Sequence, residues 1–269
     1  MDKVIHTEKK EAVTLKTVEI ESTFLNRRVR IDYFLPPSLS SSLSLLLIND
    51  GQDMEKLGLR SILENQYQQG AISPLLCAGI HAGSRITEYG TAHAADYKGR
   101  GNKAGLYTQF IFKELLPAIQ QAFPHFSFRE KAIAGFSMGG LSALDIAWNH
   151  PAHFSKVGVF SGSLWWRTRG LEDGYEEDRD RIMHAQIRSA KHKPELSFFF
   201  EAGTLDETMD RNHNGIIDAI DDTITLIDEL VKKGYYPQKD IRYLELEGGR
   251  HDVATWARAM PEFLKWGWG

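Results

Sequence analysis

The chain has 269 residues, of which 42% are hydrophobic and 25% are charged, and a formal net charge of -4 at pH 7. These values predict a folded protein with an ordinary core and a mildly acidic surface, and they argue against a nucleic-acid-binding protein, which usually carries a basic excess. The single cysteine, Cys77, allows no internal disulfide, no stretch is long enough to span a bilayer, and residues 1–11 are too polar for a signal peptide, so we expect a cytoplasmic protein without a membrane partner.

The first predicted elements form an antiparallel pair of strands. Residues 13–21 and 29–35 alternate between apolar and polar side chains, as strands with one solvent-facing side do. Residues 1–42 are therefore assigned to an N-terminal strand pair that belongs to the main sheet. The serine-rich residues 38–44 begin beside two prolines, which predicts a break before the next strand.

Later apolar runs are short, as expected for parallel strands that are buried on both faces. They lie at residues 43–48, 75–80, 131–134, 157–160, 196–200 and 241–246. Helical patterns lie between most of them, at residues 104–123, 141–148, 175–190 and 221–233, and a final helix is expected over 253–266. Strands that alternate with helices predict a doubly wound sheet. The order fits an α/β-hydrolase fold with a mainly parallel eight-stranded sheet, flanked by helices on both faces, in a single domain over residues 1–269.

The most informative segment is residues 135–140, Gly-Phe-Ser-Met-Gly-Gly. It spells G-x-S-x-G between an apolar run and a helical pattern, which is the context of a nucleophile elbow. Glycines on both sides of the serine permit a tight turn, and the helix places the positive end of its dipole beneath the reacting atom. A serine hydroxyl also needs a base to take its proton and donors to bind the oxyanion. Ser137 is the predicted nucleophile.

The partners of the serine are expected later in the chain, because this fold orders its triad as serine, acid and histidine. Only His213 and His251 follow a plausible acid, and His251 lies in a glycine-rich turn after the last strand. Glu201 continues a strand pattern and is expected to point sideways or to make a structural hydrogen bond. Of the turn residues Asp206 and Glu207, we favour Asp206 as the acid that orients the imidazole and stabilises the imidazolium. Glu207 stays the alternative.

Two backbone N–H groups are predicted to bind the oxyanion. One belongs to Met138, the residue after the nucleophile, and the second comes from the loop after the third strand. That loop is residues 49–53, where a glycine allows close approach of the chain, and we nominate the N–H of Gln52. The alternative is an ordinary tight turn without a catalytic role.

Several segments of this chain, taken in order, resemble the esterase D type branch of the α/β-hydrolases, and within it the enterochelin (siderophore trilactone) esterases. The resemblance covers most of the chain from Leu45 onwards. It rests on residues 49–52, 135–140, 161–166, 201–204 and 248–252, with Trp256 following. Unlike this chain, siderophore esterases of that type usually carry a separate N-terminal domain.

The resemblance implies hydrolysis of carboxylic esters through a serine acyl-enzyme, with no cofactor for the chemistry. It also implies that Trp165 and Trp166 lie near the acyl or aromatic part of a substrate, with core packing as the alternative. The family includes feruloyl and acetyl-sugar esterases, so its motifs do not select among siderophore, feruloyl and acetyl-sugar esters. Arg85 belongs to a basic cluster that also contains Lys98, Arg100 and Lys103, and this cluster either meets an anionic substrate or lies on a solvated loop.

A second site is predicted from residues 210–221, which nearly repeat the calcium-loop pattern D-x-[DN]-x-[DN]-G. The candidate ligands are Asp210, Asn212, Asn214, Asp218 and Asp221, with the backbone carbonyl of Ile216. The last position holds aspartate where an EF-hand has glutamate, which resembles dockerin-type loops. His213 occupies a non-ligand position, which leaves His251 as the catalytic base. We predict a structural Ca²⁺ that supports the turn carrying the acid; the alternative is an acidic turn without metal.

The leading hypothesis is a serine esterase that acts on a small-molecule or oligosaccharide ester. An acyltransferase that uses the same acyl-enzyme is the alternative among enzymes. A calcium-dependent binding module on an inactive hydrolase scaffold is the alternative among other protein classes. The sequence does not predict the oligomeric state.

Overall fold

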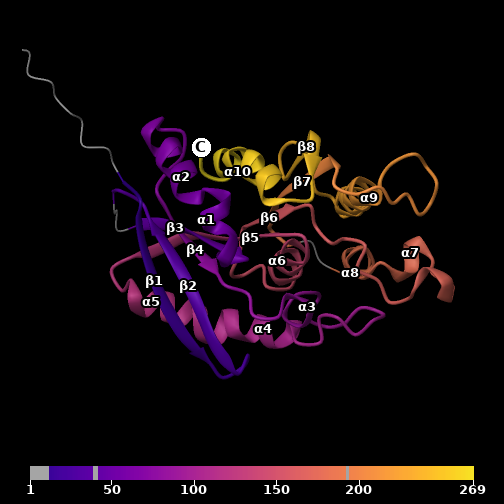
Figure 1. Cartoon of the computed structure of the whole chain (residues 1–269), viewed down its shortest axis with the longest axis horizontal. Helices are drawn as coiled ribbons and strands as arrows, with labels where there is room; N and C mark the ends of the chain where they lie inside the picture. The colour runs from indigo at the N-terminus through magenta and orange to yellow at the C-terminus, as the bar shows by residue number, and fades with distance from the viewer. Residues whose placement is uncertain (1–11, 39–41, 192–193) are drawn as a thin grey trace, which may run out of the picture.

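The computed structural model describes residues 12–38, 42–191 and 194–269 (Figure 1). Residues 1–11, on which the signal-peptide prediction depends, and residues 39–41 of the serine-rich stretch lie outside this part. Within the described residues, no helix combines the length and the apolar character that crossing a membrane requires.

An eight-stranded sheet organises the molecule, in the order β1-β2-β4-β3-β5-β6-β7-β8. Its strands are β1 (Thr14–Ser22), β2 (Arg27–Leu35), β3 (Ser42–Asn49), β4 (Leu75–Ile80), β5 (Ser127–Phe136), β6 (Lys156–Phe160), β7 (Ser197–Leu205) and β8 (Ile241–Arg250). β2 is antiparallel to both β1 and β4, and every other neighbouring pair is parallel. The predicted α/β-hydrolase sheet and its N-terminal antiparallel pair are confirmed.

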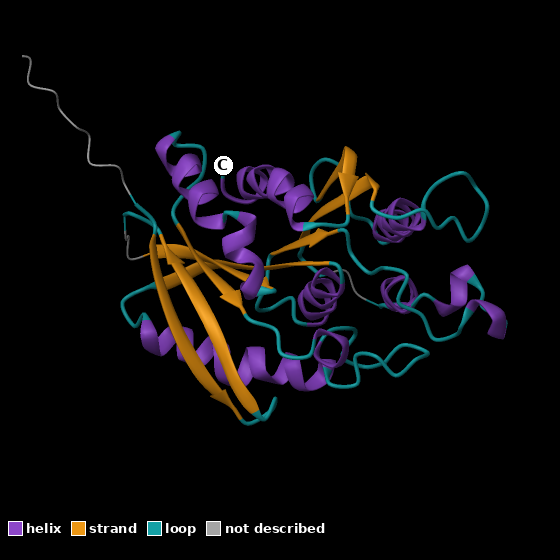
Figure 2. Ribbon diagram, viewed as in Figure 1, coloured by secondary structure: helices purple, strands orange, loops and turns teal. Residues whose placement is uncertain are grey.

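Helices cover both faces of the sheet, as Figures 1 and 2 show. One face carries α1 (Met54–Leu57), α2 (Leu59–Gln68) and α10 (Val253–Trp268). The other carries α4 (Ala104–Phe110), a π-helical turn (Ile111–Leu115), α5 (Leu116–Ala122), α6 (Met138–Asn149), α8 (Ile182–Ser189) and α9 (Asp218–Lys232). The short helices α3 (Arg85–Glu88) and α7 (Glu177–Asp180) lie in the connections, as do the 3-10 turns Gly51–Asp53 and Leu171–Asp173.

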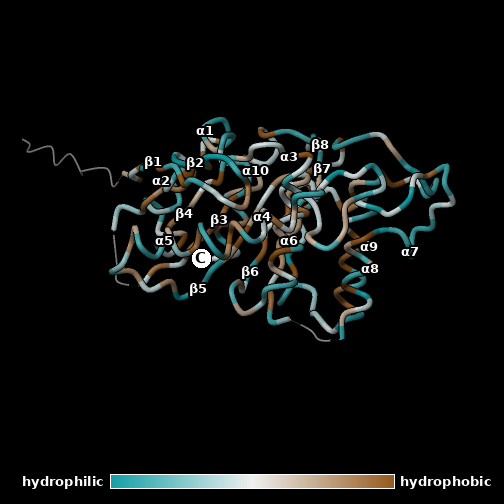
Figure 3. Tube along the Cα trace, turned by 90° about the horizontal axis from the view of Figure 1, so that it is seen from below, coloured by the Kyte–Doolittle hydropathy of each residue, from teal (hydrophilic) through white to brown (hydrophobic). Residues whose placement is uncertain are grey.

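The strands fill both halves of the core because successive side chains point to opposite faces. On β7, Phe198 and Phe200 belong to the cluster under α8 and α9, whereas Phe199 belongs to the cluster under α10. Phe199 makes edge contact with Phe263 of α10, with ring centroids 5.3 Å apart. Figure 3 shows hydrophobic residues along the strands and helices and hydrophilic ones in peripheral loops. The sheet is therefore held from both sides.

The structure corrects one predicted helix and adds two that were not predicted. The helix expected over residues 175–190 is divided into α7 and α8, because Arg181 has extended backbone (φ -73°, ψ 108°). This break turns the chain so that the buried Arg181 guanidinium reaches Asp222, with a nitrogen–oxygen distance of 2.9 Å. The helices α1 and α2 were not predicted, although Leu57, Leu59 and Leu63 give them a buried apolar side.

Candidate active site

The predicted catalytic residues lie at one edge of the sheet, where the parallel strands β5 to β8 end. In an α/β sheet this carboxyl edge is where ligand sites form. The register aligns Phe136 with Phe160 on the neighbouring strand, and Phe160 with Glu201 on the next. Leu205 and Arg250 pair at the ends of β7 and β8. The residues that follow these positions therefore share one edge.

Ser137 has a strained backbone, with φ 54° and ψ -122°. Positive φ is uncommon for a residue with a side chain and costs about 1–3 kcal/mol, so the surroundings must hold it. Its N–H donates to the carbonyl of Phe160 at 2.8 Å, and α6 begins at the next residue. Gly135 lies against the backbone of Gly139, where a Cβ has no room. These features are those of a nucleophile elbow, with the Ser137 Oγ 3.3 Å from the Oγ of Ser163.

Asp206 and His251 directly follow the paired strand ends Leu205 and Arg250, which brings them to adjacent turns. The imidazole of His251 lies against Trp256 in edge contact, with ring centroids 5.5 Å apart. Desolvation lowers the pKa of His251, the positive charge of Arg85 adds to this effect, and the negative charge of Asp206 opposes it. The structure thus places Asp206 and His251 on adjacent turns, at the edge of the sheet that also carries Ser137.

The environments of the two candidate acids differ. Desolvation raises the pKa of Asp206, and the nearby His251 charge acts in the opposite direction. Desolvation also raises the pKa of Glu207, but there the neighbouring charge is that of Asp218, on the side of α9. The charges of Asp206 and Asp252 both act on His251, and that of Glu207 is not among them. Of the two candidate acids, this favours Asp206 over Glu207.

The two predicted oxyanion donors lie in the first turns of helices, where N–H groups have no acceptor within the helix. Met138 is the first residue of α6, and Gln52 lies in the 3-10 turn Gly51–Asp53. The turn is pressed against β4, since a Cβ on Gly51 lies 2.5 Å from the carbonyl carbon of Gly79. The side chain of Gln52 is fixed too: it donates to Asp50 at 2.9 Å and accepts from the N–H of Ala82 at 3.0 Å.

A buried acid that the sequence reasoning missed joins this turn to the elbow. Asp50 is 1% exposed and has a left-handed backbone, with φ 64°. Burial raises the pKa of Asp50, whereas Arg85, with its Nε 2.8 Å from the carboxylate, lowers it. The same guanidinium donates to the carbonyl of Phe136 at 3.4 Å. Asn49 is buried as well and donates to the carbonyl of Gly139 at 2.7 Å. In the sequence, the polar pair Asn49-Asp50 directly after an apolar strand was the signal for these buried groups.

The predicted substrate residues fall into different environments. Arg85 lies at the site, as just described. Trp166 is fully buried and fills space beside Gly90 and Gly101, so it packs beneath the loop and presents no surface to a substrate. Trp165 is part-exposed, and the guanidinium of Arg100 lies 4.7 Å from its ring centroid.

The calcium-type loop has backbone torsions that suit its pattern, with positive φ at His213 (57°) and Gly215 (86°). The carboxylate of Asp210 accepts from the N–H groups of Asn214 and Gly215, at 3.0 and 2.9 Å. The side-chain amides of Asn212 and Asn214 both reach the carboxylate of Asp221, at 3.2 and 2.8 Å. Asp210, Asn212, Asn214 and Asp221 thus converge within the loop, and the chain at Ile216 is exposed beside them.

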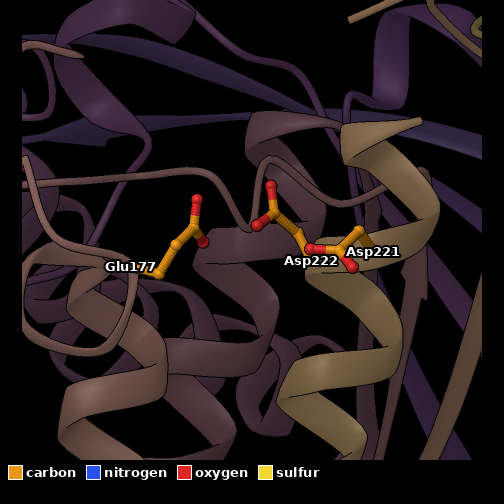
Figure 4. A group of neighbouring side chains, drawn as sticks. All are labelled: Glu177, Asp221 and Asp222. Carbon is orange, nitrogen blue, oxygen red and sulfur yellow. The ribbon is translucent and has the colours of Figure 1, made fainter. Parts of the chain in front are cut away.

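Asp218 departs from this arrangement, because Arg211 binds both of its carboxylate oxygens, at 2.9 Å through its backbone N–H and 3.1 Å through its guanidinium. A neighbouring acidic group, formed by Glu177, Asp221 and Asp222, is drawn in Figure 4, where the carboxylates of Glu177 and Asp222 approach one another. The guanidinium of Arg211 pairs with Glu177 at 2.5 Å and also with Asp222. The guanidinium of Arg211 therefore already offsets the negative charge of these carboxylates.

Comparison with known proteins identifies relatives of this chain. The family model named Esterase matches residues 22–266. The siderophore triacetylfusarinine C esterase of Aspergillus fumigatus is 35% identical over 65 residues, which are 24% of this chain and 22% of the fungal protein. An enterochelin esterase structure from Shigella flexneri superposes with a TM-score of 0.72 at 22% identity, over 93% of this chain and 57% of that one. A ferulic acid esterase structure gives 0.68 at 18% identity, over 95% and 97%.

Arg85→Gln is expected to raise the pKa of His251, because the substitution removes a positive charge that disfavours the imidazolium. An NMR titration of the imidazole resonances measures this directly, and the midpoint moves to higher pH in the variant. Arg28→Gln is the matched control, since Arg28 is exposed on β2 and paired with Glu21. An unchanged or lowered midpoint in Arg85→Gln contradicts the assigned geometry.

Proposed function

The chain belongs to the Esterase family, and on that premise we propose that it hydrolyses carboxylic esters through a covalent acyl-enzyme on Ser137. The observation that carries the proposal is the strained Ser137 elbow beside the Asp206–His251 pair on adjacent strand ends. An esterase of this kind needs no cofactor for its chemistry. The chain spans 57% of the Shigella esterase, so the relatives' substrates are carried over here only as proposals.

In the proposed reaction, His251 takes the proton of the Ser137 hydroxyl as its oxygen attacks the acyl carbon. The N–H groups of Met138 and Gln52 bind the oxyanion of the tetrahedral intermediate. As the intermediate collapses, the carbon–oxygen bond to the alcohol breaks and His251 returns the proton to that alcohol. Water then attacks the acyl-enzyme by the same route, which releases the acid and regenerates Ser137. Asp206 holds the imidazole and stabilises its charged form without taking the proton.

Asp206→Asn is expected to lower kcat for a short-chain aryl ester by about 10³-fold or more, because the amide no longer holds the productive imidazole tautomer. Ser137→Ala and His251→Ala are expected to lower kcat at least as far as Asp206→Asn does. Glu207→Gln is the matched control and should retain kcat within about threefold. A large loss in Glu207→Gln with normal turnover in Asp206→Asn moves the acid to Glu207, and retained turnover in Ser137→Ala refutes the mechanism.

We propose that the substrate is a siderophore or feruloyl-type ester, with an acetyl-sugar ester the less favoured choice. Trp165 is part-exposed and follows Ser163 by two residues in the chain, and the guanidinium of Arg100 lies over its ring. This pair forms an aromatic and cationic surface that can contact an aromatic acyl group. The Aspergillus and Shigella relatives are named for siderophore esters, and the third for a ferulic acid ester. Stacking of an aromatic acyl group is worth about 0.5–1.5 kcal/mol beyond area burial, which an acetyl group does not gain.

A panel of catecholate trilactone, feruloyl and acetyl-sugar esters tests this choice by kcat/KM. We expect the aromatic esters to exceed the acetyl-sugar ester by about tenfold, which corresponds to about 1.4 kcal/mol. Trp165→Ala should reduce the difference while its turnover of the acetyl-sugar ester stays unchanged. Equal specificity constants across the panel, or a preference for the acetyl ester, contradict the proposal.

We also propose a structural Ca²⁺ in the loop over residues 210–221. Support comes from the convergence of Asp210, Asn212, Asn214 and Asp221, and from an exposed chain at Ile216 that can offer its carbonyl. Asp218 is bound by Arg211, but the corresponding position of such loops often acts through a water molecule. Because the loop begins shortly after Asp206, the ion would restrain the turn that carries the acid.

Millimolar calcium is expected to raise Tm by about 5 °C over the value in chelator, since ligand at about 100 times Kd adds about 2.7 kcal/mol to a folded protein. Asp210→Asn should abolish this shift, while Asp228→Asn, a charge-matched change on α9 outside the loop, should keep it. Identical melting of the native chain with chelator and with calcium contradicts the proposed ion site.

A further inference from the structure

A second carboxyl group lies behind the catalytic acid. Glu201, on β7, is 1% exposed, and its carbonyl accepts from the N–H of Ser161 at 2.8 Å. Its Oε2 accepts from the Ser161 hydroxyl at 3.4 Å, whereas its Oε1 is buried and lacks a hydrogen-bond partner among the described residues. Both carboxylate oxygens of Asp206 are likewise buried without a partner in that part of the chain.

The charges around Glu201 do not neutralise a second carboxylate. The charge of Asp206, in the turn after β7, acts on it, and Tyr243 of β8 is also close enough to interact with it. The positive charge of Arg258 on α10 lowers the pKa of Glu201, but desolvation and Asp206 outweigh this effect. No lysine or arginine within the described ranges binds Glu201 Oε1 or either carboxylate oxygen of Asp206, and the charge of His251 acts on Asp206. Desolvation, followed by the negative charge of Asp206, raises the pKa of Glu201 to about 8.

The neighbouring hydroxyl cannot supply the missing hydrogen bonds. Ser161 Oγ accepts from the indole Nε1 of Trp256 at 2.9 Å and has one proton of its own, which it can donate to Glu201 or to Asp206 but not to both. Three carboxyl oxygens therefore stay without a donor, and an unsatisfied buried charged group costs several kcal/mol. One proton removes both problems, because a neutral carboxylic acid carries one charge less and has an O–H that donates.

We propose that Glu201 is a positioning residue of the triad, which remains a carboxylic acid at neutral pH and holds one proton in common with Asp206. The pair then carries a single negative charge, and the shared proton gives the Asp206 carboxylate a donor that fixes its orientation towards His251. This inference rests on the proposed triad for its catalytic consequence. Its protonation state can be measured without any turnover.

Infrared spectroscopy gives the measurement that does not depend on activity. The difference spectrum between the native chain and Glu201→Gln at pH 7 should contain the C=O stretching band of one protonated carboxyl group. The band should disappear as the pH rises above about 8. Glu247→Gln, an exposed glutamate on β8, is the matched control and should give no such band. A difference spectrum without the protonated band at pH 7 overturns the inference, whatever the activity.

The pH profile of kcat/KM tests the positioning role. In Glu201→Gln the amide is neutral and keeps an N–H donor, so we expect turnover at pH 7 within about threefold of the native value and an unmoved acid limb. The decline of the native chain above pH 8 should be absent in this variant. Glu201→Ala, which lacks any donor, should lose kcat by about tenfold with little change in KM.

The outcomes separate this inference from the proposed function. An acid limb that moves to lower pH in Glu201→Gln means that the native residue is ionised beside His251, and it overturns the inference. Full kcat in Glu201→Ala does so as well, because a donor to Asp206 is then not needed. If the native chain cleaves no ester but the infrared band is present, the esterase proposal fails while the shared proton stands.

Discussion

The backbone at Ser137 is the constraint on which the rest of the site depends. A positive φ at a residue with a side chain persists only when its surroundings over-determine it. Here the N–H of Ser137 is bound to Phe160, and its carbonyl accepts from the N–H groups of Leu141 and Ser163. Close packing of Gly135 on Gly139 completes the turn. The energy that holds the serine therefore comes from β6 and α6, which belong to the core.

Buried carboxyl groups surround this turn, and each is stabilised by a different means. Asp50 is paired with Arg85, which ties the turn after β3 to the carbonyl before the nucleophile. The negative charge of Asp206 acts on the imidazole of His251. Glu201 forms no salt bridge among the described residues, the positive charge of Arg258 does not outweigh its desolvation, and in our account a proton takes the place of a paired cation. One edge of the sheet thus carries several acids with a limited total charge, which lets His251 stay a neutral base.

Arginines organise the region that follows the catalytic acid. Arg181 and Arg211 are both nearly buried and converge on Asp222, at the start of α9. Their charges are offset by Glu177 and Asp218 as well. This network fixes α7 and α8 against α9, and it leaves the calcium-type loop as the exposed part of the same turn. Breaking the predicted helix at Arg181 is the structural cost of bringing a guanidinium into the network.

The sequence by itself determined the sheet, the elbow and the order of the candidate triad, because alternating apolar periods and the G-x-S-x-G turn are local patterns. It also pointed to Arg85. Only the tertiary structure decided that Trp166 is core, that the charge of Asp206 acts on His251, and that Asp50 is bound to the arginine that reaches the elbow. Those distinctions depend on burial and on contacts between distant segments. A sequence shows which residues can ionise, but their neighbours in space decide how they do so.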